Sequence, residues 1–155
     1  MKNKYWAIKI DGAWFVDVDL QGDSPEAKFS CTNKIEHARL FDEKTFKGMV
    51  LAIGGMFHSA KITGFEVEIE SEIVESSDEY VVKFDSVGEY MIRPREGGVS
   101  CTKNLDCAGT FSKEHAEAWA KHYEAYSTLD ILADRLQGTM SIVPVKRTIG
   151  EPKEI

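Results

Sequence analysis

The sequence predicts an α+β protein made of two tandem pseudo-symmetric β-hairpin–strand–helix–strand units packed as one body. Three observations support this prediction. The 155 residues, 43% of them hydrophobic, suffice for one compact domain or two very small ones. Short β-rich runs alternate with helical patterns, and the chain repeats its own sequence. We expect repeat unit one over residues 1–75, repeat unit two over 76–148, and a flexible tail over 149–155.

The repeat is clearest where residues 99–111 align without a gap on residues 29–41. Five positions are identical in this alignment, and they follow one another in the same order. Such ordered identity indicates an internal duplication. The identical pairs are Ser30/Ser100, Cys31/Cys101, Thr32/Thr102, Ala38/Ala108 and Phe41/Phe111.

Each unit opens with a predicted β-hairpin. In unit one, β-rich runs at 6–10 and 13–18 flank Asp11-Gly12, a pair suited to a two-residue turn because both positions need positive φ. In unit two, runs at 80–84 and 89–92 flank a four-residue loop that contains Gly88.

Helices follow in each unit. Thr32 and Thr102 are predicted to cap a short helical turn, and Asp42 and Ser112 to cap a longer amphipathic helix. The first helix is expected to end at Gly54-Gly55. The second changes its apolar phase near Ser127, so it is either one bent helix or two. Closing strands are predicted over residues 61–74 and 139–146.

Composition excludes several classes of protein. The net charge of −7 argues against general nucleic-acid binding. No apolar run approaches the roughly 20 residues of a membrane span, and the first residues lack the apolar core of a signal peptide. Three cysteines without CxxC spacing indicate a reducing compartment, so we expect a cytoplasmic protein.

No organised catalytic motif is present in the sequence. It lacks a glycine-rich phosphate loop, and His115 and His122 lie two helical turns apart, about 10 Å, too far to share a metal ion. Cys31 and Cys101 occupy the same repeat position. One of them could be a nucleophile, the two could meet across a pseudo-twofold axis, or both could be small buried fillers. We interpret them as fillers. The sequence therefore predicts no enzyme, no catalytic residue, no metal and no cofactor.

The acid excess is concentrated in one stretch. Residues 1–79 hold 15 acids and 9 bases, and residues 66–79 hold seven acids and no base. Alternation in a strand places neighbouring residues on opposite faces. The predicted apolar face comprises Phe65, Val67, Ile69 and Ile73, and the predicted acidic face comprises Glu66, Glu68, Glu70 and Glu72.

This acidic strand has two interpretations. Carboxylates two residues apart recur about every 6.6–7 Å, close to the phosphate spacing of an extended nucleic-acid strand, so the row could occupy a basic groove. Alternatively, the glutamates are an ordinary solvated face that discourages strand-to-strand aggregation. The matched aromatics Trp14 and Tyr90 likewise form either an outward interaction patch or part of the core.

The order of parts resembles a short module of small phage and prophage proteins of Gram-positive bacteria. The resemblance rests on a K-φ-D-G turn, the SCT…A..F motif, an acidic helix cap, an amphipathic helix and a closing strand, and it covers both halves of the chain. It implies a mobile-element context, in which small acidic proteins bind and block host machinery, and it implies no catalytic residues.

These features predict a non-enzymatic inhibitor, of anti-CRISPR or anti-restriction type. We expect it to block a nucleic-acid-handling host defence protein in the bacterial cytoplasm, without touching nucleic acid or membrane itself. Homodimerisation is left open. The candidate partner-binding residues are Glu66, Glu68, Glu70, Glu72, Glu75, Trp14 and Tyr90.

Three alternatives remain. The chain could sequester a signalling nucleotide in a cleft between the units, it could be a structural or adaptor phage protein, or it could be an enzyme. The nucleotide hypothesis requires four basic residues to converge: Arg93, Arg95, Lys146 and Arg147.

Overall fold

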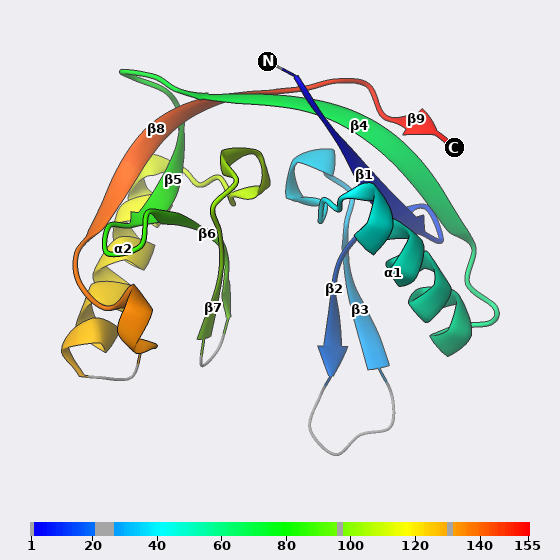
Figure 1. Cartoon of the computed structure of the whole chain (residues 1–155), viewed down its shortest axis with the longest axis horizontal. Coiled ribbons are helices and arrows are strands. Elements are labelled where there is room, and N and C mark those ends of the chain that lie inside the picture. Colours follow the sequence, from blue (N-terminus) through cyan, green and yellow to red (C-terminus); the bar gives the residue numbers. More distant parts are fainter. Residues whose placement is uncertain (1, 21–26, 96–97, 130–131) are drawn as a thin grey trace. The chain divides into compact units, whose positions relative to one another are not determined.

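The computed structural model describes residues 2–20, 27–95, 98–129 and 132–155. The chain divides into two compact units, which we call unit 1 (Met1–Glu70 with Ile149–Ile155) and unit 2 (Ser71–Thr148). Both combine antiparallel strands with one α-helix, which confirms the predicted α+β class (Figure 1).

Unit 1 contains a sheet in the order β3-β2-β1-β4, and a short C-terminal strand, β9, pairs with β4. Strand β4 runs on past the end of the unit. The elements are β1 (Asn3–Ile10), β2 (Ala13–Leu20), β3 (Ala27–Thr32), the 3₁₀ turn η1 (Ile35–His37), α1 (Glu43–Met56), β4 (Ile62–Ile73) and β9 (Lys153–Glu154).

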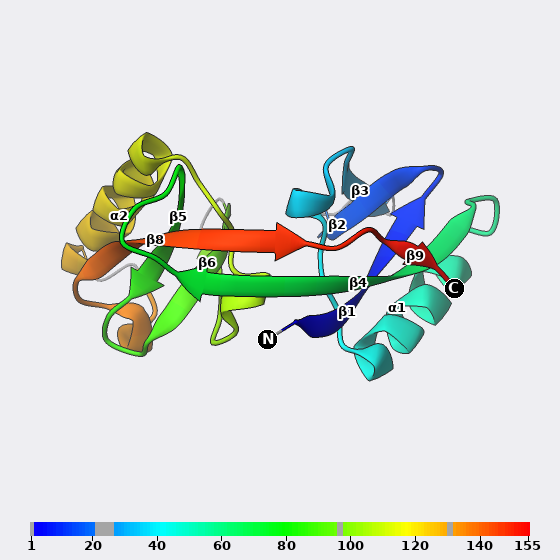
Figure 2. The same cartoon turned by 90° about the horizontal axis from the view of Figure 1, so that it is seen from above.

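Unit 2 has its strands in the order β8-β5-β6-β7, so each closing strand pairs with the first strand of its own unit. Figures 1 and 2 show α1 running alongside β1, and α2 alongside β5. The elements are β5 (Glu79–Phe84), β6 (Glu89–Arg95), β7 (Gly98–Thr102), η2 (Leu105–Cys107), α2 (Lys113–Thr128), η3 (Asp134–Leu136) and β8 (Met140–Ile149).

The hairpin turns have the backbone that the sequence predicts. Asp11 and Gly12 both have positive φ, at 50° and 87°, and the pair Ile10↔Ala13 closes the two-residue turn. In unit 2 the longer turn ends at Gly88, which has φ 68° and donates its N–H to the carbonyl of Phe84 at 2.9 Å. Both turns therefore depend on a residue that tolerates the left-handed region.

Strand register repeats between the units. Cys31 lies opposite Phe15, and Cys101 lies opposite Met91, the residue that the sequence alignment matches to Phe15. A bulge follows at the same place in each unit, before Asp17 and before Arg93. The packing of the two units as one pseudo-symmetric body stays a prediction.

A backbone bridge precedes each long helix. Trp6 and Phe41 exchange two hydrogen bonds of 2.9 and 2.8 Å, and Tyr80 and Phe111 exchange two of 2.8 Å. The next residue is the helix cap in both units, as predicted. The Asp42 carboxylate accepts the N–H of Thr45 at 2.7 Å, and the hydroxyl of Ser112 accepts that of His115 at 3.3 Å.

The short helical turns begin later than predicted. Thr32 and Thr102 do not cap them; each hydroxyl accepts the N–H two residues on, from Lys34 at 3.2 Å and Asn104 at 3.0 Å. The residues that precede the 3₁₀ turns are Lys34 and Asn104, and the Asn104 side chain accepts the N–H of Asp106 at 3.0 Å.

The end of α2 resolves the choice between one bent helix and two. The α-helix stops at Thr128 and a separate 3₁₀ turn, η3, follows; residues 130–131 lie outside the described residues. The hydroxyl of Ser127, near which the apolar pattern changes phase, accepts the N–H of Gly138 at 2.8 Å.

Each first strand is buried on both faces. Ala7 and Ile8 are neighbours in β1 and both are 0% exposed, as are Val81 and Val82 in β5. One face packs against the α-helix of the same unit. In unit 1 this helix-facing core consists of Ile8, Ile10, Phe15, Phe41, Phe46 and Ile53, and in unit 2 of Val82, Phe84, Met91, Ala116, Ala120, Tyr123, Leu132, Leu136 and Met140.

The C-terminal residues 149–155, for which the sequence predicts a flexible tail, group with unit 1. Gly150 donates its N–H to the Glu68 carbonyl at 2.8 Å, and Ile155 to the Gly64 carbonyl at 3.0 Å. The division between the units falls after Glu70, inside β4, five residues before the predicted boundary at 75.

Replacing Gly109 with alanine should destabilise the protein. A Cβ on Gly109 would overlap the backbone carbonyl oxygen of Ile92, and forced overpacking costs about 1–3 kcal/mol. Gly48→Ala, in the exposed middle of α1 with open space around it, is the control and should raise stability by up to about 1 kcal/mol. Urea denaturation measures both; a Gly109→Ala midpoint at or above wild type contradicts this account.

Candidate functional site

The acidic strand in unit 1 has its predicted alternation. Val67 and Ile69 are 1% and 2% exposed, and the glutamates between and beside them point to the other face. Glu66 is half-buried and Glu68 is exposed. Hydrogen bonds on both sides hold this part of β4, from β1 and from the C-terminal segment, so its carboxylates stand on a fixed backbone.

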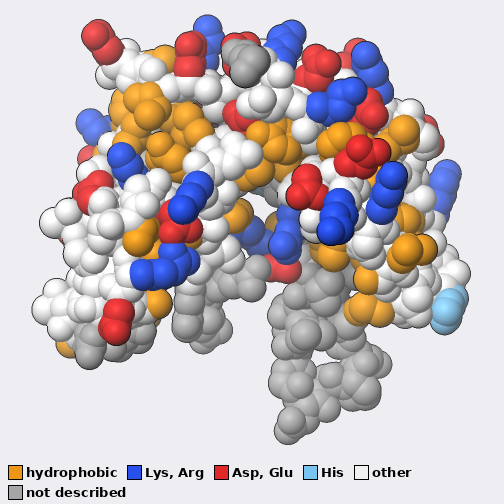
Figure 3. All heavy atoms as spheres, viewed as in Figure 1, with side chains coloured by type: hydrophobic (Ala, Val, Ile, Leu, Met, Phe, Trp, Pro, Cys, Tyr) orange, Lys and Arg blue, Asp and Glu red, His pale blue; other side chains and the backbone are white. Residues whose placement is uncertain are grey.

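Two lysines lie beside these carboxylates. Lys4 stands opposite Glu68 on β1, and its Nζ is 3.6 Å from the carboxylate of Glu66. Lys153 stands opposite Glu66 on β9. Figure 3 shows acidic and basic side chains interspersed over the visible face of unit 1. The field of the acidic strand is thus partly compensated within its own unit, although an exposed ion pair contributes only about 0–1 kcal/mol.

The acidic residues divide between the units. Glu66, Glu68 and Glu70 belong to unit 1, whereas Glu72 and Glu75 belong to unit 2, and both of the latter are exposed. Hydrogen bonds tie the residues after β4 to β8: Val74 donates to the Pro144 carbonyl at 3.1 Å, and Ser77 to the Val145 carbonyl at 2.7 Å.

The predicted apolar face of the acidic strand is shorter than the sequence suggested. Ile73 was expected on it with Val67 and Ile69, but its side chain is 58% exposed. Ile73 lies beyond the division at Glu70, where the strand has left the core of unit 1. Alternation alone therefore overestimates the length of the buried face.

The matched aromatics differ in exposure. Trp14 is 6% exposed and packs edge-on against Phe65, with ring centroids 5.0 Å apart and the Lys9 Nζ 4.7 Å above the indole. Its indole offers almost no surface to a partner. Tyr90 is half-buried and packs beside the buried residues Val81, Ala108 and Val145.

The cysteines lack the electrostatics of activated thiols. Burial, reinforced by Glu89 and opposed by Arg135, raises the pKa of Cys101 to about 11. Burial, reinforced by Asp106 and opposed by Arg147, raises the pKa of Cys107 to about 11. Cys31 is exposed, so its interpretation as a buried filler is wrong; partial burial of the thiol and then Asp11 raise its pKa. A nucleophilic or metal-binding cysteine needs the opposite shift.

Metal-binding side chains do not gather in the described ranges: no three His, Cys, Asp or Glu residues there could hold one ion.

The basic residues of the nucleotide hypothesis have different environments. Arg147 donates to the carbonyls of Ala108 at 2.9 Å and Leu105 at 2.6 Å and to the hydroxyl of Ser71 at 3.1 Å, so its guanidinium secures η2. Lys146 is exposed on β8, and the side chain of Arg95 lies outside the described part of the chain. Arg93 is half-buried, and its Nη1 is buried with no hydrogen-bond partner among the described residues.

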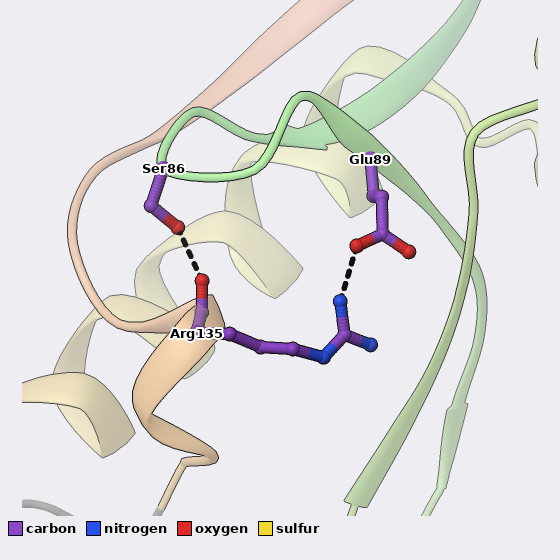
Figure 4. Close-up of polar contacts among 3 residues, drawn as sticks. All are labelled: Ser86, Glu89 and Arg135. Carbon is purple, nitrogen blue, oxygen red and sulfur yellow. Dashed lines mark hydrogen bonds and ion pairs between the residues drawn. The ribbon is translucent and has the colours of Figure 1, made fainter.

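Sequence reasoning missed a polar cluster around the second hairpin turn. Figure 4 shows the guanidinium of Arg135, on η3, pointing at the carboxylate of Glu89, and the hydroxyl of Ser86 donating to the Arg135 carbonyl at 2.7 Å. Nearby, Asp85 accepts the hydroxyls of Thr139 at 3.0 Å and Ser141 at 2.9 Å. The cluster fastens the turn to η3 and to β8.

An aromatic stripe on α2 was also missed as a surface. The exposed ring of His122 lies 4.2 Å from that of Tyr126 and 5.5 Å from that of Trp119. The i, i+3, i+7 spacing of Trp119, His122 and Tyr126 is visible in the sequence, but Trp119 and Tyr126 also fit the apolar side of the predicted amphipathic helix. Both are half-buried and serve core and surface together.

No family model, curated protein or solved structure matches the chain. Within the described ranges, no helix combines the length and apolar character that crossing a membrane requires. Any functional conclusion must therefore come from the residues themselves.

Thiol reactivity should follow the raised pKa values. At pH 8 about one in a thousand Cys101 or Cys107 side chains is a thiolate, so Cys31 should react first with a maleimide or disulfide reagent. In Cys31→Ser the remaining rate should rise about tenfold per pH unit up to roughly pH 11. Rapid labelling of Cys31→Ser at pH 8 would show that burial does not protect the other thiols.

Loss of the Arg135 side chain should destabilise unit 2. The Glu89 side chain is only 13% exposed, so Arg135→Ala leaves a largely buried carboxylate without its ion partner, at a cost of about 1–3 kcal/mol. Lys47→Ala, which removes the exposed pair with Glu43, should cost no more than about 0.5 kcal/mol. Equal denaturation midpoints for the two variants would contradict this difference.

Proposed function

We propose that the protein is a non-enzymatic binding module that inhibits a nucleic-acid-handling host protein, with the acidic strand as its contact surface. The supporting observation is the fixed row of carboxylates on β4, whose intervening residues Val67 and Ile69 are anchored in the core. A preorganised row loses little conformational entropy on binding, which favours affinity.

The contact is electrostatic in this proposal. Carboxylates spaced about 6.6–7 Å apart along a strand match a groove whose Lys and Arg side chains are placed for successive phosphates. Such a row speeds the encounter and excludes the nucleic acid by occupying its site. The resemblance to small phage and prophage proteins supports a host protein as the target.

The neighbouring lysines determine which glutamates matter most. Lys4 and Lys153 offset the charge at Glu66, so the exposed Glu68, Glu72 and Glu75 carry the greater part of the attraction. Trp14 contributes little, because it is buried, whereas Tyr90 has a partly accessible ring.

Replacing Glu68, Glu72 and Glu75 by glutamine should weaken partner binding by tenfold or more, equivalent to about 1.4 kcal/mol, and flatten its salt dependence. The partner is first captured from bacterial lysate on the wild-type chain, and its dissociation constant is then measured against salt concentration. A single-stranded oligonucleotide should release the captured partner, because the two compete for one groove.

The control has the same change in charge at exposed glutamates elsewhere: Glu114 and Glu117 on α2, and Glu151, each replaced by glutamine. This variant should bind like wild type. The proposal fails if both triple variants bind equally well, or if the oligonucleotide leaves the complex intact.

A further inference from the structure

An ion pair of unit 1 has no counterpart at the matched positions of unit 2. In unit 1, Arg39 donates its backbone N–H to the Phe15 carbonyl at 3.0 Å, and its guanidinium donates to the carboxylate of Asp17 at 3.4 Å. In unit 2, Gly109 donates its N–H to the Met91 carbonyl at 2.9 Å, and Arg93 takes the place of Asp17. The backbone is the same, but the ion pair is replaced by an arginine and a glycine.

In unit 2, Gly109 stands at the position matched to Arg39 and offers no side chain to pair with Arg93. A Cβ on Gly109 would overlap the carbonyl oxygen of Ile92, so no side chain fits there without moving the backbone. Among the described residues the Nη1 of Arg93 consequently has no hydrogen-bond partner, although it is buried. A buried, unpaired guanidinium nitrogen is unfavourable for the free protein.

We propose that Arg93 is an oxyanion-binding residue, which takes a phosphate or carboxylate group of a small ligand. The planar guanidinium presents parallel N–H donors that match two oxygens of such a group. Ser100 lies directly opposite Arg93 on β7 and brings a hydroxyl to the same position. Arg147 is excluded from this role because its guanidinium is already bonded to the backbone around η2.

The closing strands show the same inversion of charge. In unit 1, the exposed Glu68 stands two residues after Glu66, which lies opposite Trp6. In unit 2, the exposed Lys146 stands two residues after Pro144, which lies opposite Tyr80. Glu68 and Lys146 therefore occupy matched positions. Unit 2 is therefore basic where unit 1 is acidic at two matched places. This site is independent of the acidic strand and goes beyond the function proposed for it.

The test measures thermal unfolding of the full chain in inorganic phosphate, in acetate and in chloride at equal ionic strength. A bound oxyanion stabilises the folded state in proportion to its occupancy, so phosphate or acetate should raise the Tm above that in chloride. The Arg93→Met variant keeps the apolar stem but removes the guanidinium. It should lose the rise while being at least as stable as wild type in chloride.

Arg39→Met is the control, since it removes the arginine of unit 1 that pairs with Asp17, the residue matched to Arg93. It should keep the full rise in Tm. Comparing phosphate with acetate distinguishes a phosphorylated ligand from a carboxylic acid. Unchanged Tm in both oxyanions for wild type, or an equal rise in Arg93→Met, overturns the proposal.

An NMR readout keeps the test valid if Arg93→Met does not fold. The Nε–H signal of Arg93 in the wild-type protein should shift progressively with millimolar phosphate, and the Nε–H signal of Arg147 should not. Equal movement of both signals, or none in that of Arg93, also overturns the proposal.

Discussion

Both units depend on a two-bond bridge between the first strand and the residue before the long helix. Trp6 and Phe41 exchange both backbone hydrogen bonds in unit 1, as do Tyr80 and Phe111 in unit 2. The second strand of each unit pairs with the first only near the hairpin turn. Farther from the turn, the bridging phenylalanine forms the backbone hydrogen bonds to the first strand. The helix cap is the next residue, and the bridge therefore sets where each helix starts and which face of the sheet it covers.

That placement explains why the first strands are continuous apolar runs rather than alternating ones. A helix covers the face with Ile8, while Ala7 on the other face is equally buried, and Val82 and Val81 repeat this arrangement. Burial of each large apolar side chain contributes about 1.5–3 kcal/mol, so most of the stability of a small unit must come from this strand and its neighbours. Substitution is accordingly restricted there, and matched positions outside it are freer to diverge.

The fold was predictable from the sequence wherever the signal is local. The Asp11-Gly12 turn, the caps at Asp42 and Ser112, and the α+β class follow from backbone conformation and capping chemistry that a few adjacent residues determine. Features that depend on distant residues were not predictable. The sequence pattern could not show where the buried face ends before Ile73, or that Arg135 reaches Glu89 across 46 residues. Nor could it show that the Nη1 of Arg93 has no hydrogen-bond partner in the described part of the chain.

Matched positions in the two units share backbone hydrogen bonds and differ in charge. Of the residues that recur, Phe41 and Phe111 pack in the cores of their own units, as does Cys101, whereas the matched Cys31 is exposed. What differs on the shared backbone is charge: Asp17 against Arg93, and Glu68 against Lys146. Among the described residues the buried Nη1 of Arg93 has no hydrogen-bond partner, which is unfavourable for the free protein. Under the two proposals made above, the chain binds two different ligands, one through the carboxylates of the acidic strand and one through Arg93 of unit 2.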